Sequence, residues 1–198
     1  MTRTQVINTI AESIQAKSYL EVGTRNPADN LLQVNVAYRV GVEPRWKEEG
    51  RAPEPVSGVV CAPFTSDEYF SACERKFDVI FIDANHTAEA SQRDLLNALA
   101  HLARGGFVIL HDCLPRNERE AAPVKPSGGS AWSGEVWRTW AYARSRKDLV
   151  THCVDCDHGC GIIRRGRAQR NHPNEEKCTW REAGWQAIVT PAEFKATL

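Results

Sequence analysis

The sequence lacks the features that mark membrane, secreted and nucleic-acid-binding proteins. Its 25 Lys and Arg residues are balanced by 25 Asp and Glu residues, so no excess positive charge is available to bind nucleic acid or an acidic membrane surface. No apolar run approaches the roughly 20 residues of a membrane span, and the N-terminus has no apolar signal segment. Seven cysteines, an odd number, cannot all form disulfides, which favours reduced thiols. We therefore expect a soluble, cytoplasmic protein with no nucleic-acid or membrane partner.

The 198 residues contain no internal repeat and suffice for a sizeable core. Apolar residues recur at helical spacing in residues 4–16, and short apolar runs then alternate with further helical segments. The clearest run, residues 77–83, has the continuous apolar centre of a parallel strand covered on both faces. This alternation predicts an α/β fold, a doubly wound and mostly parallel sheet with helices on both faces. We expect one domain over residues 1–198, with an N-terminal helix within residues 1–17.

Several boundaries follow from local signals. We expect a turn into a second helix near residues 31–34, a surface loop over residues 45–57, and a helix capped by Ser66. Residues 104–106, Arg-Gly-Gly, are expected to end the helix that begins at residue 88. Residues 113–133 hold three prolines and no apolar period, which predicts a lid or mobile loop. Residues 166–198 form a polar tail, and the tryptophans within it could pack it against the rest of the protein.

Ligands of an open α/β sheet bind outside the carboxyl ends of its strands. Gly23 ends the first expected strand, and Glu43 follows twenty residues later at the end of the second, where a carboxylate can bind a ribose. A dinucleotide needs a second glycine where this chain has Arg25. S-adenosylmethionine has no phosphate, and Glu21 suits its cationic end. A sulfonium nucleoside is therefore favoured, although a tight turn in any α/β protein would give the same short pattern.

Seven segments occur in a recognisable order: EVG (21–23), GVE (41–43), FTSDEYF (64–70), FDVIFIDANH (77–86), LARGGFVILHD (102–112), GEVW (134–137) and DHGCGII (157–163). In these segments the chain resembles small class I S-adenosylmethionine-dependent methyltransferases. More narrowly, it resembles macrolide-sugar O-methyltransferases and, more remotely, catechol O-methyltransferase. The resemblance implies a Rossmann-like, seven-stranded sheet whose last strand is antiparallel, and methyl transfer to a hydroxyl of a small molecule or sugar.

The resemblance also implies which residues hold the cofactor. Glu21 and Gly23 would contact its methionine end, Glu43 its ribose, and Ser66 and Asp67 its adenine. The full expected cofactor set is Glu21, Gly23, Thr24, Glu43, Ser66, Asp67 and Asp83.

Two acids at strand ends are the expected metal ligands. In the catechol-type relatives the matching acids bind Mg²⁺, and they correspond here to Asp83 and Asp112. The relatives' third ligand is an Asn, but this chain has Cys113, and a thiol is a poor ligand for Mg²⁺. Metal-assisted and metal-free reactions therefore both stay open.

The candidate catalytic residues are His86, Asp112 and His111. His86 falls where the relatives keep the base that takes the acceptor's proton, and the alternative is a helix cap. Strand alternation turns His111 away from Asp112, so packing beneath Asp112 is the alternative to a direct role.

Other functions fit less well. Cys153 and Cys156, with His158 and Cys160, have a spacing that suggests zinc, but strand alternation sends the first two to opposite faces. An NAD(P)-dependent oxidoreductase is disfavoured by the missing second glycine and the absence of a Tyr-x-x-x-Lys pair. A non-catalytic nucleoside-binding module is the third alternative. A homo-oligomer is compatible with the sequence.

Overall fold

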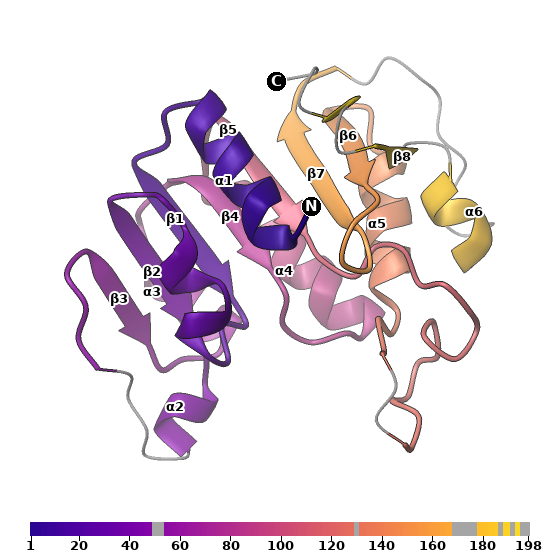
Figure 1. Ribbon diagram of the computed structural model, residues 1–198, viewed down its shortest axis with the longest axis horizontal. Helices are drawn as coiled ribbons and strands as arrows, with labels where there is room; N and C mark the ends of the chain where they lie inside the picture. The colour runs from indigo at the N-terminus through magenta and orange to yellow at the C-terminus, as the bar shows by residue number, and fades with distance from the viewer. Residues whose placement is uncertain (49–53, 129–130, 168–177, 186–187, 191–192, 195–198) are drawn as a thin grey trace.

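One mixed β-sheet forms the centre of the molecule (Figure 1). The computed structural model describes residues 1–48, 54–128, 131–167, 178–185, 188–190 and 193–194. The strands are β1 (Ser18–Val22), β2 (Tyr38–Val42), β3 (Val59–Ala62), β4 (Phe77–Ile82), β5 (Leu102–Leu110), β6 (Leu149–Val154), β7 (Cys160–Arg165) and β8 (Ile188–Val189).

The strand order is β3-β2-β1-β4-β5-β7-β6-β8. The strands from β3 to β5 pair in parallel, whereas β7 is antiparallel to both β5 and β6. A short turn joins β6 to β7, and only an antiparallel pair can be joined that way. The predicted seven-stranded, doubly wound sheet with an antiparallel last strand is therefore confirmed. The two-residue β8, which pairs in parallel with β6, is an addition that the polar tail did not predict.

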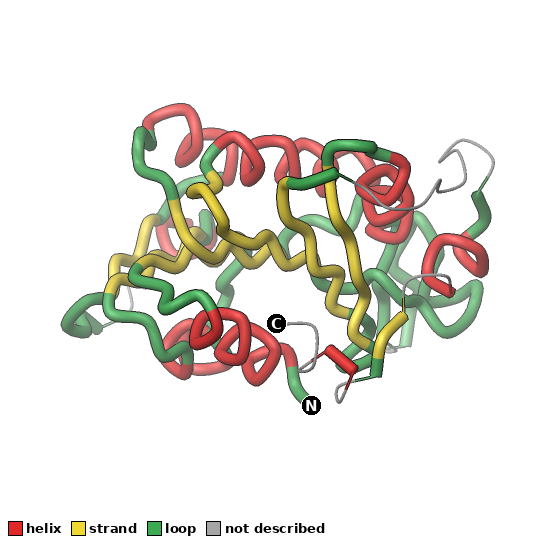
Figure 2. Tube along the Cα trace, turned by 90° about the horizontal axis from the view of Figure 1, so that it is seen from above, coloured by secondary structure: helices red, strands yellow, loops and turns green. Residues whose placement is uncertain are grey.

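Helices cover both faces of the sheet (Figure 2). They are α1 (Arg3–Ser13), α2 (Arg45–Glu48), α3 (Ser66–Ala72), α4 (Ala88–Ala100), α5 (Val136–Ser145) and α6 (Trp180–Trp185). On one face, α3, α4 and α5 bury apolar side chains against the strands, with Trp140 of α5 fully enclosed. On the other face, α1 packs against β1, β4 and β5. None of these helices is long and apolar enough to cross a membrane.

Two expectations for the segments that follow β1 and β2 were wrong. Instead of a second helix, β1 is followed by two single-turn 3₁₀ helices, Pro27–Asp29 and Leu31–Gln33. Leu31 and Val34 are apolar because they pack against α1, so their spacing reflects tertiary burial rather than a helix of their own. The expected surface loop also begins with α2, and its Trp46 is buried with the indole N–H donating to the carbonyl of Arg25 at 3.0 Å.

Two helix ends also differ from prediction. Thr65, not Ser66, caps α3, because its hydroxyl accepts from the Glu68 N–H while the Glu68 carboxylate accepts from the Thr65 N–H. Helix α4 ends at Ala100, and residues 104–106 lie inside β5. A Cβ at Gly106 would lie 2.6 Å from the carbonyl oxygen of Asp78, so this glycine permits close strand approach at an irregularity in the β4–β5 pairing.

The tail docks through one tryptophan, as expected. Trp180 packs against a small cluster formed by Ala121, Trp137, Ala141 and Cys178. Residues 113–128 and 131–133, the described parts of the predicted lid, form no helix or strand. Backbone hydrogen bonds nevertheless stabilise this segment, because the N–H groups of Ser133 and Gly134 donate to the carbonyl of Glu120 at 3.0 and 2.9 Å. Whether this segment opens as a lid stays a prediction.

Candidate active site

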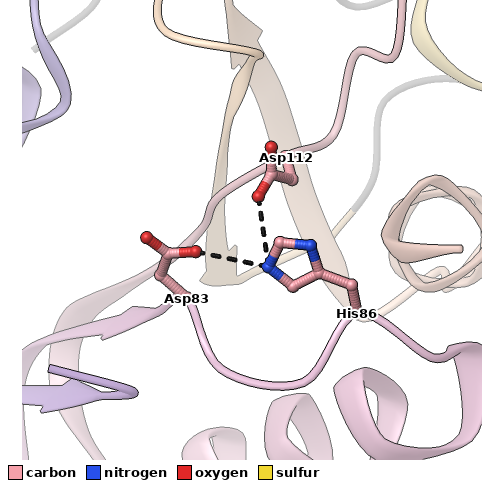
Figure 3. A group of neighbouring side chains, drawn as sticks. All are labelled: Asp83, His86 and Asp112. Atoms are coloured by element: carbon pink, nitrogen blue, oxygen red, sulfur yellow. Dashed lines mark ion pairs between the residues drawn. The ribbon is translucent and has the colours of Figure 1, made fainter. Parts of the chain in front are cut away.

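Three side chains meet at the carboxyl ends of the two central strands (Figure 3). Asp83 follows β4 directly and Asp112 lies just beyond β5, and the parallel pairing of these strands brings both acids to one edge. His86, in the loop after β4, places its Nε2 3.6 Å from Asp83 Oδ1 and 3.4 Å from Asp112 Oδ2. We refer to Asp83, His86 and Asp112 as the central cluster.

In each carboxylate of the central cluster, the oxygen that does not face His86 has a partner of its own. The guanidinium of Arg3, from α1, lies 3.3 Å from Asp83 Oδ2. The hydroxyl of Ser133 donates to Asp112 Oδ1 at 3.0 Å. Asp112 also has a positive φ of 60°, a left-handed conformation that Asp tolerates better than most residues. The remaining oxygens, Asp83 Oδ1 and Asp112 Oδ2, are thereby directed at His86.

The ring of His86 is oriented by Trp132. Its Nδ1 lies 3.0 Å from the Trp132 carbonyl oxygen, and the two rings stack with centroids 5.0 Å apart. A carbonyl can only accept, so Nδ1 carries a hydrogen, and Nε2 presents either a lone pair or a second hydrogen to the two carboxylates. Burial lowers the pKa of His86, but the hydrogen bond to Asp83 and the charge of Asp112 outweigh it and raise the pKa above its usual 6.5.

His111 also lies in the site, although strand alternation was expected to turn it away from Asp112. Its Nδ1 lies 3.3 Å from Asp112 Oδ2 and 3.5 Å from Asp83 Oδ1, and its Nε2 lies 3.7 Å from Asp157 Oδ2. Strand alternation failed as a guide because β5 ends at Leu110 and Asp112 adopts a left-handed conformation. Although burial lowers the pKa of His111, hydrogen bonds to the three acids raise it well above 6.5.

Nearby positive charges also determine the protonation state of Asp83. Burial alone would raise its pKa, but the nearby imidazoles of His111 and His86 and the guanidinium of Arg3 hold the pKa far below its usual 3.8. Asp83 is therefore ionised at neutral pH. The space beside the central cluster is a cavity of about 10 Å³, roughly the room that one water molecule needs.

The turn at Gly23, which was predicted to contact the cofactor, lies against this site. Gly23 has a φ of 87°, and a Cβ there would lie 2.2 Å from the carbonyl oxygen of Asp83, so only glycine fits. Glu21, at the end of β1, is buried, and its Oε2 accepts from the Tyr19 hydroxyl and the Asn30 amide, both at 2.7 Å. Burial raises the pKa of Glu21 from 4.5 to about 7.

Glu43 links the loops that follow β1 and β2. Its Oε2 accepts from the Arg25 N–H at 3.0 Å and its Oε1 from the Arg45 N–H at 3.1 Å. Thr24 is buried, and its hydroxyl donates to the carbonyl of Glu21 at 3.3 Å. Glu43 and Thr24 therefore stabilise the turn around Gly23, and their contact with a cofactor stays a prediction.

The two residues expected near the adenine have partners in α4. Asp67 forms an ion pair with Arg93 at 3.0 Å, and the side chain of Ser66 hydrogen-bonds Asp94. Both residues stand at the start of α3, where their described contacts join α3 to α4. Their adenine contact stays a prediction.

Cys113 does not face the central cluster. Its thiol donates to the carbonyl oxygen of Leu110 at 3.1 Å and is fully buried beside Gly161 of β7. The suggested zinc site gains no support either. Cys156 and Cys160 have their sulfurs 3.8 Å apart, but within the described part of the chain the central cluster is the one set of three acids, histidines or cysteines placed to hold a metal ion.

Four residues of the site went unnoticed in the sequence: Arg3, Trp132, Ser133 and Asp157. Arg3 is 80 residues from Asp83 and sits in a helix, where it gives no local signal of a role at the strand ends. Asp157 and Ser133 lie in turns whose course the sequence does not specify. Two of the segments quoted above pointed toward this region: GEVW (134–137), directly after Ser133, and DHGCGII (157–163), which begins at Asp157.

Comparison with known proteins agrees with this geometry. A family model described as a methyltransferase domain matches residues 29–113, which run from the loop after β1 to just past Asp112. No curated protein sequence matches the chain significantly. The match spans β2 to β5, and the strand order of the sheet is that of the Rossmann-like methyltransferase fold.

Solved structures share the fold at low sequence identity. A methyltransferase of Podospora anserina bound to S-adenosylhomocysteine is 16% identical, with a TM-score of 0.60 over 83% of this chain and 78% of that one. The O-methyltransferase TomG of Streptomyces achromogenes, in complex with S-adenosylmethionine, is 17% identical, with a TM-score of 0.56 over 82% and 79%. The N-methyltransferase NodS of Bradyrhizobium japonicum is 17% identical, with a TM-score of 0.57 over 84% and 94%. The fold therefore occurs with both oxygen and nitrogen acceptors.

Proposed function

We propose that this protein transfers the methyl group of S-adenosylmethionine to a hydroxyl oxygen of a small molecule or sugar. The observation that carries the proposal is the central cluster, which lies at the carboxyl edge of the sheet against the Gly23 turn. An oxygen acceptor needs to lose its proton for an in-line displacement, and the cluster offers acids and an imidazole at that place. The O-methyltransferases among the similar structures support the same choice.

The residues around Gly23 suit the cofactor. The Glu43 carboxylate is held by two backbone N–H groups, and each oxygen keeps a further lone pair for a ribose hydroxyl. Glu21 is directed toward Tyr19 and Asn30, so its expected contribution to the cationic end of the cofactor is electrostatic. When bound, S-adenosylmethionine supplies an electrophilic methyl group on a sulfonium.

Residues of the central cluster take up the proton that the acceptor hydroxyl loses. In the absence of a cation, His86 Nε2 is the atom of the central cluster that can accept it, because Nδ1 is committed to the Trp132 carbonyl. Asp83 and Asp112 stabilise the imidazolium that results. The Mg²⁺ implied by the resemblance fits these residues poorly, since Cys113 faces the core and the third donor of the cluster is a nitrogen. We therefore route no step through Mg²⁺.

Calorimetric titration of the full chain with S-adenosylmethionine, S-adenosylhomocysteine and NADPH tests the proposal. We expect micromolar binding of the first two compounds and none of NADPH. Binding of NADPH alone would instead support the oxidoreductase. Glu43→Ala should weaken S-adenosylmethionine binding, and unchanged affinity would remove the ribose assignment. Cofactor binding without methyl transfer to any of a panel of hydroxylated acceptors would favour the non-catalytic module.

A further inference from the structure

We infer that Cys156 and Cys160 are a site of reversible oxidation, at which a hydroperoxide converts the two thiols to a disulfide that shifts the β6–β7 turn. The two cysteines stand on either side of this turn, and their sulfurs lie 3.8 Å apart. All seven cysteines are free thiols in the structure. The oxidation does not depend on the proposed function, and only its effect on methyl transfer does.

The fold separates this pair from the two other cysteines of the same region. Cys156 and Cys160 pack in the apolar layer between the sheet and α1, whereas Cys113 and Cys153 pack in the layer on the opposite face of the sheet. Val154 pairs with Cys160 across the β6–β7 ladder, and Cys156 follows Val154 by two residues on the same face. This arrangement matches Cys156 with Cys160 rather than with Cys153.

Cys156 is the thiol suited to react first. The hydrogen bond with Cys160 lowers the pKa of the Cys156 thiol and outweighs the effect of burial. By contrast, the hydrogen bond with Cys156, together with burial, raises the pKa of Cys160, and burial raises the pKa of Cys61. Because the thiolate is the nucleophile, oxidation begins at Cys156.

Cys156 also lies at the accessible end of the pair. It is 9% exposed, and the side chains of Asp157 and His158, which follow it, are 38% and 28% exposed. Cys160 is fully buried, but it needs no contact with the oxidant because it reacts with Cys156 within the chain. A small hydroperoxide therefore suffices as the oxidant.

The reaction balances as a two-electron oxidation. The Cys156 thiolate attacks one oxygen of hydrogen peroxide, the O–O bond breaks, and the departing hydroxide takes up a proton to give water, which leaves a sulfenic acid on Cys156. The Cys160 sulfur then attacks the Cys156 sulfur, the S–O bond breaks, and the hydroxyl leaves as water with the Cys160 thiol proton. Two thiols and one peroxide thus give one disulfide and two waters.

The disulfide changes the turn because the sulfurs need to approach each other. A disulfide S–S bond is about 2.05 Å long, so the two sulfurs close by roughly 1.8 Å. The turn between them consists of three consecutive left-handed residues, Asp157, His158 and Gly159, with φ of 44°, 65° and 89°. The Gly159 N–H donates to the carbonyl of Cys156 at 2.7 Å, which ties the turn directly to the reacting residue.

The same turn holds the loop that follows Asp112. The carbonyl of His158 accepts from the Leu114 N–H at 2.8 Å, and the carbonyl of Gly159 accepts from the Cys113 N–H at 3.2 Å. A Cβ at Gly159 would lie 2.6 Å from Leu114 Cγ, so the turn and this loop are in close contact. A shift of the turn therefore loosens these two backbone hydrogen bonds.

Asp157 extends the change to the candidate active site. It directly follows Cys156, and its Oδ2 lies 3.7 Å from His111 Nε2 and 3.7 Å from Arg3 Nε. His111 and Arg3 also contact the Asp83 carboxylate. Oxidation of the thiol pair therefore alters the ion pairs beside the central cluster.

The test is treatment of the full chain with equimolar hydrogen peroxide, followed by iodoacetamide and mass spectrometry of the peptides. The free thiols should fall from seven to five per chain, because the disulfide consumes two. The peptide that holds Cys156 and Cys160 should become lighter by two hydrogen atoms and take up no iodoacetamide, and dithiothreitol should reverse both changes. In the oxidised protein, the N–H groups of Cys113 and Leu114 should lose protection against hydrogen exchange.

Two variants and a control separate the pair from general oxidation. Cys160→Ser keeps the first thiol and should leave a sulfenic acid on Cys156 that dimedone traps, with no disulfide. Cys156→Ser should give neither product at this turn. Cys61→Ser removes a more exposed thiol on β3 and should form the disulfide as the wild type does. Circular dichroism checks that each variant is folded.

The inference is overturned if Cys61 or Cys73 is oxidised while Cys156 stays reduced, or if the disulfide joins other cysteines. It is also overturned if the disulfide forms and the exchange of the Cys113 and Leu114 N–H groups is unchanged. None of these measurements uses the cofactor or an acceptor. A failure of the methyltransferase proposal, seen as no binding of S-adenosylmethionine, is therefore distinguishable from a failure of the thiol pair.

Discussion

Replacing Glu21 with Gln tests the buried network beneath the cofactor turn. Glu21 is only 3% exposed, and one of its carboxylate oxygens accepts hydrogen bonds from Tyr19 and Asn30. Asn30 is positioned in turn by the hydroxyl of Thr4, which donates to its Oδ1 at 2.8 Å. A Gln carbonyl oxygen can accept the same two bonds, so the substitution removes the titrating proton while keeping the contacts.

The sign and size of the effect follow from the pKa. Burial raises the pKa of Glu21 from 4.5 to about 7 in the folded protein. Between these values the folded state holds a proton that the unfolded state has lost, so the free energy of unfolding falls as the pH rises. A shift from 4.5 to about 7, at 1.36 kcal/mol per unit, corresponds to about 3 kcal/mol. Glu21→Gln should not show this loss.

Urea denaturation of both proteins near pH 5 and near pH 8 measures the effect. Relative to wild type, Glu21→Gln should gain about 2.5 kcal/mol of unfolding free energy between the two conditions, slightly less than the full value because the unfolded-state carboxyl is already mostly ionised at pH 5. Glu12→Gln, on the exposed face of α1, is the matched control and should show no such gain. If the difference between wild type and Glu21→Gln is the same at both pH values, burial does not keep Glu21 protonated and the reasoning fails.

Three further predictions concern the turn, the core and the thiols. Gly23→Ala should lower the melting temperature and abolish S-adenosylmethionine binding, because a Cβ would lie 2.2 Å from the Asp83 carbonyl; wild-type binding in calorimetry would contradict this. Trp140→Ala should reduce the unfolding free energy in urea by about 3–5 kcal/mol, because the side chain is fully buried. A thiol reagent should label the partly exposed Cys61 before the buried Cys113, and equal rates in the folded protein would argue against this packing.

Local patterns in the sequence sufficed for the centre of the fold. The apolar run of β4 and the glycine after β1 are short-range signals, and they correctly placed the strand ends that carry Asp83 and Gly23. Parallel pairing of β4 with β5 then brought Asp112 beside Asp83, as the expected sheet required. These parts of the site were predictable because strand pairing alone creates them.

The supporting contacts depend on tertiary structure and could not be read from the sequence. Arg3 reaches Asp83 only because α1 packs across the sheet, and Asp157 reaches His111 only through the β6–β7 turn. The orientation of His111 was mispredicted for a related reason. Alternation holds within a strand, but the chain leaves β5 before Asp112 and turns into a left-handed conformation.

The left-handed backbone at Asp112 bears on how the site should be probed by mutagenesis. At a φ of 60° an alanine would add backbone strain of about 1–2 kcal/mol, whereas Asn tolerates the conformation and removes only the charge. An inactive Asp112→Ala protein would therefore confound strain with lost chemistry. Asp112→Asn isolates the carboxylate, and it is the substitution from which a catalytic or ligating role can be concluded.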